Sequence, residues 1–109
     1  MDYDETLAQR IRDAMAGEQG LSERKMFGGL TFLLNGHMSF GVVGHDLMLR
    51  LGNDGANQAL TQPHVRAMDF TGKPMKGMVY IEPEGLHGDA LTHWLQQAAA
   101  FTRTLPLKA

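Results

Sequence analysis

The sequence predicts an α+β fold of two layers, with an antiparallel sheet of about five strands and helices on one face. Patterns with the period of a strand occur in blocks, which favours an antiparallel sheet over a parallel one. Patterns with the period of a helix lie at both ends of the chain. The expected order is one helix, three strands, a short helix, two strands and a last helix. A chain of 109 residues has the size of one domain, and we assign residues 1–109 to it.

The first helix is predicted from apolar residues that recur at helical spacing between Tyr3 and Met15. Gly17 and Gly20 follow, and glycine readily adopts the left-handed conformations that end a helix. We therefore expect an amphipathic helix of about four turns.

The first three strands are predicted between Arg24 and Leu51, where the apolar period changes to two. Asn35-Gly36 is a strong hairpin signal because both residues tolerate the positive φ of a type I′ turn. Residues 44–46 form a second turn. Three antiparallel strands in a meander follow from this spacing, with Met38 on the same face as Phe40.

The second half of the chain is predicted to hold a short helix, two strands and a long helix. The short helix covers about residues 56–60, with a cap at residues 53–55. The strands lie at residues 67–71 and 75–82. The last helix runs from about residue 89 to residue 104, and Pro106 marks its end.

One hydrophobic core is expected between the sheet and the terminal helices. Its large members are predicted to be Phe27, Leu30, Phe32, Phe40, Leu49, Trp94 and Phe101.

Several kinds of active site find no support in the sequence. There are no cysteines, so disulfides, zinc ribbons and thiol nucleophiles are excluded. The glycines match neither a phosphate-binding loop nor a dinucleotide fingerprint, and no serine lies in a nucleophile-elbow motif. His37 and His45 are too far apart along one strand to share a metal ion, and Asp89 with His93 supplies only two ligands. We therefore expect neither an enzyme nor a bound metal or cofactor.

The charge distribution bears on location and partners. The acidic amino terminus does not resemble a secretory signal, and the longest apolar stretch is too short to span a bilayer. We expect a cytoplasmic protein without membrane association. A formal net charge of −2 argues against binding nucleic acid over the whole surface, although a local basic patch remains open.

Two segments combine basic residues with glycine and are candidates for holding a phosphate or an acidic peptide. The candidate residues are Arg24, Lys25, Gly28 and Gly29 in the first segment, and Lys73 and Lys76 in the second. Turn and bulge glycines beside solvated bases are the alternative reading. We expect the two segments to lie side by side, with the strand carrying Met26 next to the one carrying Met78.

A homodimer is a further expectation. Met48 is out of phase with its leucine neighbours, so it is predicted on the outer face of the sheet, where Leu33 joins it. An apolar outer face, or the sheet edge, would suit a second copy or another partner.

The order of several short motifs resembles one protein family. The motifs are Arg24-Lys25-Met26-Phe27-Gly28-Gly29-Leu30-Thr31-Phe32, Leu49-Arg50-Leu51, Lys73-Pro74-Met75-Lys76-Gly77 and Trp94-Leu95. Together they resemble the N-terminal domain of the TfoX (Sxy) family of competence regulators, over nearly the whole chain. The resemblance implies a two-layer, secretion-chaperone-like α+β fold. Full-length members carry a second, C-terminal helical domain, which we do not expect in this chain.

The function expected from this resemblance is a regulatory one. It implies a non-enzymatic, protein-binding module in competence and transcription, with the transcription machinery, including a cyclic-AMP receptor protein, as partner. The alternative that the residues leave open is an anion or nucleic-acid binder that uses the basic glycine-rich segments.

Overall fold

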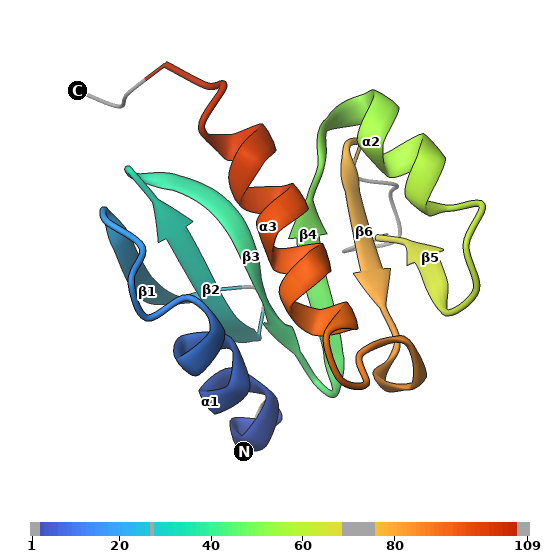
Figure 1. Ribbon diagram of the computed structural model, residues 1–109, viewed down its shortest axis with the longest axis horizontal. Coiled ribbons are helices and arrows are strands. Elements are labelled where there is room, and N and C mark those ends of the chain that lie inside the picture. Colours follow the sequence, from blue (N-terminus) through green and yellow to red (C-terminus); the bar gives the residue numbers. More distant parts are fainter. Residues whose placement is uncertain (1–2, 27, 69–75, 107–109) are drawn as a thin grey trace.

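The protein folds as an antiparallel sheet of six strands with three α-helices on one face (Figure 1). The computed structural model describes residues 3–26, 28–68 and 76–106. The strands are β1 (Leu21–Met26), β2 (Gly29–Leu34), β3 (His37–Val43), β4 (Asp46–Arg50), β5 (Val65–Ala67) and β6 (Met78–Ile81). The helices are α1 (Glu5–Ala14), α2 (Gly52–Ala59), α3 (Ala90–Thr102) and the short 3₁₀ helix η2 (Pro83–Gly85). The expected α+β class is confirmed, with one more strand than expected.

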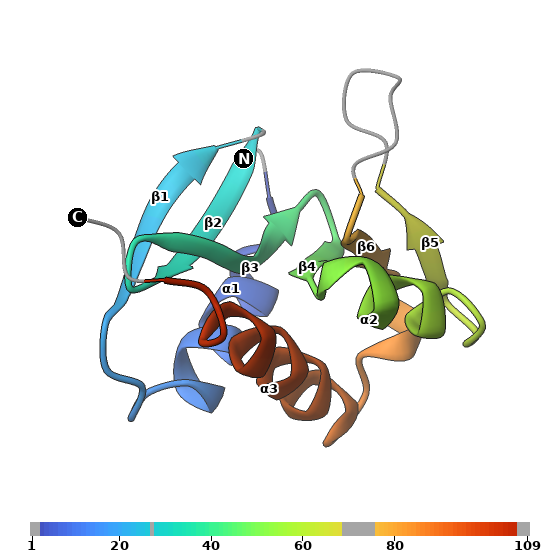
Figure 2. The same cartoon turned by 90° about the horizontal axis from the view of Figure 1, so that it is seen from above.

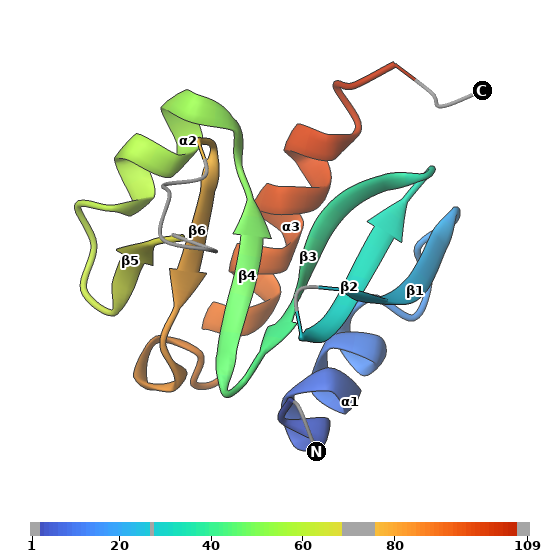
Figure 3. The same ribbon diagram turned by 180° about the vertical axis from the view of Figure 1, so that it is seen from behind.

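The sheet has the strand order β1-β2-β3-β4-β6-β5, and all its pairs are antiparallel. The first four strands form a meander. The chain then crosses through α2 and returns so that β6 pairs with β4, which leaves β5 at the far edge (Figure 3). The predicted meander is confirmed, and β1 extends it by one strand.

Some predicted boundaries differ from those of the structure. The cap expected at residues 53–55 is wrong, because α2 begins at Gly52 and Leu51 precedes it without a side-chain capping bond. The strand expected at residues 67–71 begins earlier, as β5. The rest of that strand and the start of the next fall partly at residues 69–75, outside the described residues.

The main core lies between the sheet and the helices, as predicted. The predicted members Leu30, Phe32, Phe40, Leu49 and Trp94 are all buried there. Phe27 lies outside the described residues. Phe101 differs, because it is only half-buried and sits in the last turn of α3 with its ring against Gly52.

A second apolar cluster covers the opposite face of the sheet. Its buried members are Met48, Met68, Met78 and Tyr80, with Met38 and Val43 packed against them. Figure 2 shows this face on the side of the sheet opposite α1 and α3. The outer-face position of Met48 is confirmed, but the side chain is 0% exposed and Leu33 is 9% exposed. The uncovered apolar patch that motivated a dimer is therefore absent at these two residues.

A β-bulge corrects the predicted phase of β3. The register shifts between Phe32 and Leu33, so Leu33 faces Met38 while Phe32 faces Phe40. The extra residue is Ser39, whose side chain turns toward α3. Met38 consequently joins the outer cluster instead of the face that carries Phe40. In the part of the chain that the structure describes, no helix is long and apolar enough to cross a membrane.

Candidate functional site

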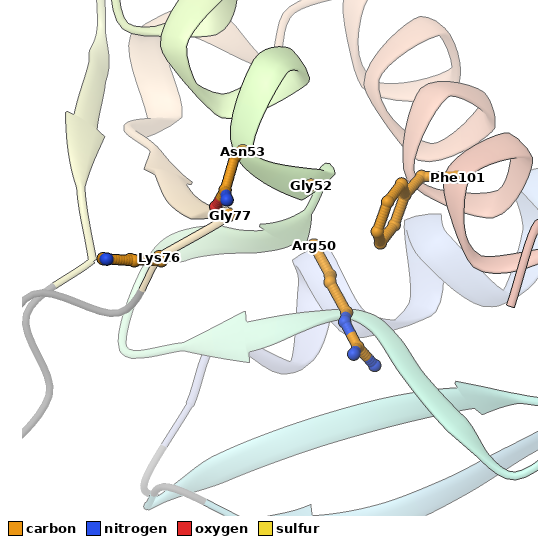
Figure 4. A pocket seen from close by; sticks show the side chains of 6 residues that line it. All are labelled: Arg50, Gly52, Asn53, Lys76, Gly77 and Phe101. Carbon is orange, nitrogen blue, oxygen red and sulfur yellow. The ribbon is translucent and has the colours of Figure 1, made fainter.

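A surface groove lies where β4 ends, α2 begins and the chain enters β6 (Figure 4). Its volume is about 340 Å³, and it is lined by Arg50, Gly52, Asn53, Lys76, Gly77 and Phe101. A second hollow of about 290 Å³ adjoins it and adds Asn57 to the shared residues Asn53, Lys76 and Gly77. We call this continuous surface the Arg50–Lys76 groove.

Two glycines shape the floor of the groove. Gly52 and Gly77 have φ values of 78° and 79°, in the left-handed region that favours glycine. The carbonyl oxygen of Gly77 accepts hydrogen bonds from the amides of Leu51 (2.8 Å) and Gly52 (3.2 Å). A Cβ atom at Gly52 would lie 2.5 Å from Cε1 of Phe101. The groove is therefore open because side chains are missing at these two positions.

The polar character of the groove is cationic. Among the residues that the structure describes, the two ionised side chains in its lining, those of Arg50 and Lys76, are positive. The first turn of α2 lies at the groove without a side-chain cap, and Asp54 in that turn offsets part of the positive charge at the amino end of the helix. Asn53 adds an amide, and Phe101 adds an apolar wall. These groups together favour a carboxylate or a phosphate over a cation.

The two basic side chains flank the floor without meeting over it. Arg50 is half-buried, and its Nη1 donates to the carbonyl oxygen of Met38 at 3.3 Å. Lys76 is exposed and extends away from Arg50 (Figure 4). A lysine side chain has four rotatable carbon–carbon bonds, so its ammonium group can move toward an anion that Arg50 already contacts.

The structure separates the site residues that the sequence predicted. Lys76 lies in the groove, and Lys73 lies outside the described residues. Arg24 and Lys25 are both exposed on β1, where successive side chains point to opposite faces of the sheet.

The two glycines of the first predicted segment serve the β1–β2 hairpin. Gly28 has a φ of 72° in the turn. Gly29 is buried in β2, and a Cβ atom there would lie 2.0 Å from the carbonyl oxygen of Val42. This glycine pair therefore serves the turn and the packing of β2 on β3, and the bulge that the alternative reading expected at this pair is wrong, because the bulge lies between Phe32 and Leu33.

The prediction that the two basic segments lie on neighbouring strands is wrong. Three strands separate β1 from β6 in the sheet. Four strand spacings amount to about 19 Å along the sheet, which exceeds the Debye length of about 8 Å at physiological salt. The reason is topological, since β6 pairs with β4 after the crossover through α2 and β1 pairs only with β2.

Arg50 is the groove residue that reasoning from the sequence did not single out. It lies at the end of an alternating strand, where a polar side chain is ordinary. Its importance follows from the pairing of Arg50 with Met78, which brings the end of β4 beside the segment that contains Lys76. The sequence signal for a groove at this point was Gly52, two residues after Arg50, because a glycine leaves the space that a side chain would fill.

Within residues 3–26, 28–68 and 76–106, no three histidine, aspartate or glutamate side chains lie close enough together to hold a metal ion.

Comparison with known proteins identifies a family. The family model of the TfoX N-terminal domain matches residues 13–102, from the last two residues of α1 through the whole sheet to the end of α3. No curated protein and no solved structure matches the chain. The matched range contains every residue of the Arg50–Lys76 groove.

Proposed function

This chain belongs to the TfoX N-terminal domain family, and on that premise we propose that it is a non-enzymatic regulatory module that binds a partner protein. The observation that carries the proposal is the Arg50–Lys76 groove, in which both charged lining residues are cations. The groove receives an acidic side chain or the terminal carboxylate of the partner. The role is in transcription and competence, inside the cytoplasm.

The groove suits recognition of one anionic group on a larger molecule. A volume of about 340 Å³ is near the lower end of the range for small-molecule sites. Arg50 can form a paired hydrogen bond with a carboxylate, since a guanidinium presents two parallel N–H groups. The half-buried ring of Phe101 gives the neighbouring partner residue an apolar surface. Affinity then comes from a few contacts around Arg50, with Lys76 adding long-range attraction.

A nucleic-acid phosphate is the second candidate ligand, because the same cations and the same helix end also favour it. Binding to DNA or RNA falls steeply as salt rises, with a slope set by the number of phosphates contacted. Two cations imply that the logarithm of the binding constant falls with the logarithm of the salt concentration with a slope near two. This slope is small for a nucleic-acid-binding protein. The protein-binding role is therefore favoured.

The test measures binding of two fluorescent probes, an oligoglutamate peptide and a single-stranded oligonucleotide, by anisotropy at several salt concentrations. The test variant is Arg50→Gln with Lys76→Gln, which removes two positive charges. The control is Gln62→Glu with Gln96→Glu, which changes the net charge equally at exposed positions outside the groove. We expect the test variant to bind the peptide roughly tenfold more weakly and the control to bind it nearly as well as the wild type.

Two results would contradict the proposal. An equal loss of affinity in the two variants would mean that only net charge matters. Tighter binding of the oligonucleotide than of the peptide, with a salt slope well above two, would transfer the function to nucleic acid. Circular dichroism of both variants verifies that each is folded before binding is measured.

A further inference from the structure

Strand β1 forms an open edge of the sheet. Its Leu21–Met26 segment pairs with β2 on one side, and among the described residues no strand pairs with its other side (Figure 3). Four successive residues, 22–25, are exposed. An edge of this kind presents a row of unpaired backbone groups, which can accept another strand.

The backbone groups that face the open edge can be identified. The amide of Asn35 donates to the carbonyl oxygen of Gly20, so Gly20 directs its backbone toward β2. Backbone direction alternates along a strand. Ser22, Arg24 and Met26 therefore also bond to β2. The amides and carbonyls of Leu21, Glu23 and Lys25 point outward.

The edge is positively charged once its internal ion pair is counted. Glu23 is held by Arg12 of α1, whose Nε and Nη2 each lie 2.9 Å from a carboxylate oxygen of Glu23. This pair cancels the only negative side chain on β1. Arg24 on the outer face and Lys25 on the helix-bearing face remain as exposed cations for which the described residues offer no ion pair.

We propose that the open edge of β1 accepts an extended acidic segment of a partner protein as an added strand. The outward amides and carbonyls of Leu21, Glu23 and Lys25 supply the backbone hydrogen bonds. Acidic residues at successive positions of the added strand then meet Arg24 on one face and Lys25 on the other, since cross-strand neighbours lie side by side. This mode of recognition combines backbone affinity with side-chain selectivity. It is independent of the Arg50–Lys76 groove, because β1 and β6 are separated by three strands.

A second copy of the chain is the less suitable occupant of this edge. The residues Arg12, Glu23, Arg24 and Lys25 carry a net positive charge, so two such edges repel each other. In the antiparallel register centred on Arg24, Arg24 would face Arg24 of the other copy, and in the register centred on Glu23 the two glutamates would face each other; like charges directly opposite each other are destabilising.

The experiment uses the full chain and a synthetic peptide in which pairs of valines alternate with pairs of glutamates, so that glutamates point to both faces of the added strand. Amide hydrogen exchange is followed by NMR with and without the peptide. We expect the amides of Glu23 and Lys25 to exchange rapidly in the free protein and at least tenfold more slowly with the peptide bound. The amides of Arg24 and Met26, already bonded to β2, should change little. This alternation is specific for strand addition.

Matched probes and variants separate backbone pairing from charge. The same peptide with a central proline keeps its charge but cannot pair fully, so it should bind more weakly and give less protection. Arg24→Gln with Lys25→Gln should weaken peptide binding at the β1 edge, followed by the protection of the Glu23 amide, roughly tenfold, whereas Gln62→Glu with Gln96→Glu, of equal charge change, should not.

Two outcomes would overturn the proposal. Peptide binding that leaves the exchange of Glu23 and Lys25 unchanged would show contact by charge alone. Protection of these two amides that grows with protein concentration in the absence of peptide, together with a doubled mass in light scattering, would assign the edge to a second copy.

Discussion

The hydroxyl oxygens of Thr102 and Ser39 lie 2.8 Å apart in the core and join the end of α3 to the bulge in β3. Thr102 Oγ1 also lies 2.7 Å from the carbonyl oxygen of Ala98. A hydroxyl group carries one hydrogen, so Thr102 donates to Ala98 and accepts from Ser39. Both side chains are buried, at 2% and 0% exposure. The bulge thus places a polar residue inside the core, and the helix supplies its partner.

Thr102→Val should lower the free energy of unfolding by about 1–3 kcal/mol, because it leaves the buried Ser39 hydroxyl without an acceptor. Ser39→Ala should cost less, since Thr102 keeps its bond to Ala98. The double variant should be more stable than the sum of the single losses implies. Urea denaturation of all four proteins measures this. Strict additivity would mean that the two hydroxyls do not interact.

Trp94→Ala should destabilise the domain by about 3–5 kcal/mol, because Trp94 is 6% exposed and belongs to the main core. The matched control is Leu60→Ala, since Leu60 is 40% exposed and its truncation removes little buried area. The denaturation midpoint should therefore fall sharply for the first variant and barely for the second. An unchanged midpoint for Trp94→Ala would mean that α3 does not depend on this side chain for its packing.

Much of the fold could be predicted from local patterns. Alternation at Leu30, Phe32 and Leu34, with the turn at Asn35-Gly36, was enough to place the β2–β3 hairpin. Strand β1 was missed because its sequence, Leu-Ser-Glu-Arg-Lys-Met, has no apolar alternation. It forms a strand because all six of its residues pair with β2. An edge strand is exposed to solvent, so its side chains can be charged.

The candidate site could not be predicted, because it depends on the order of strands across the sheet. Lys76 was singled out from its neighbours in sequence, whereas Arg50 joins it only through the pairing of β4 with β6. Arg24 was grouped with Lys76 by composition, and the strand order places them far apart. Residue pairing over long sequence separations leaves no periodic signal in one sequence.

Gly52→Ala should lower the free energy of unfolding by about 2–4 kcal/mol, because two separate destabilising effects add. The φ of 78° is unfavourable for any residue with a Cβ atom, and that atom would lie 2.5 Å from the Phe101 ring. Gly28→Ala is the matched control, because its φ of 72° carries the first penalty while nothing lies within 4 Å of the added atom. The difference between the two losses in denaturant midpoint measures the contact with Phe101. Equal losses would show that the ring moves aside freely.

The ion pair between Arg12 and Glu23 should make stability depend on pH in the acidic range. The hydrogen bonds from Arg12 hold the pKa of Glu23 below its ordinary value of 4.5. A carboxyl group whose pKa is lowered by folding stabilises the protein above its unfolded pKa. That contribution is lost as the pH falls through the lower folded pKa.

Glu23→Gln should therefore reduce the free energy of unfolding near pH 7 by less than about 1 kcal/mol, since the pair is partly exposed. The deficit should shrink as the pH falls below about 4.5 and vanish once the pH is low enough to protonate Glu23 in both states of the wild type. Asp4 keeps its own contribution in the variant, because its pKa is lowered by the amide of Leu7. Glu84→Gln is the control, since Glu84 is exposed and has no ion pair among the described residues. Urea denaturation of the three proteins across this range provides the measurement, and a deficit of Glu23→Gln that stays constant down to pH 2 would mean that the charge of Glu23 is not its source.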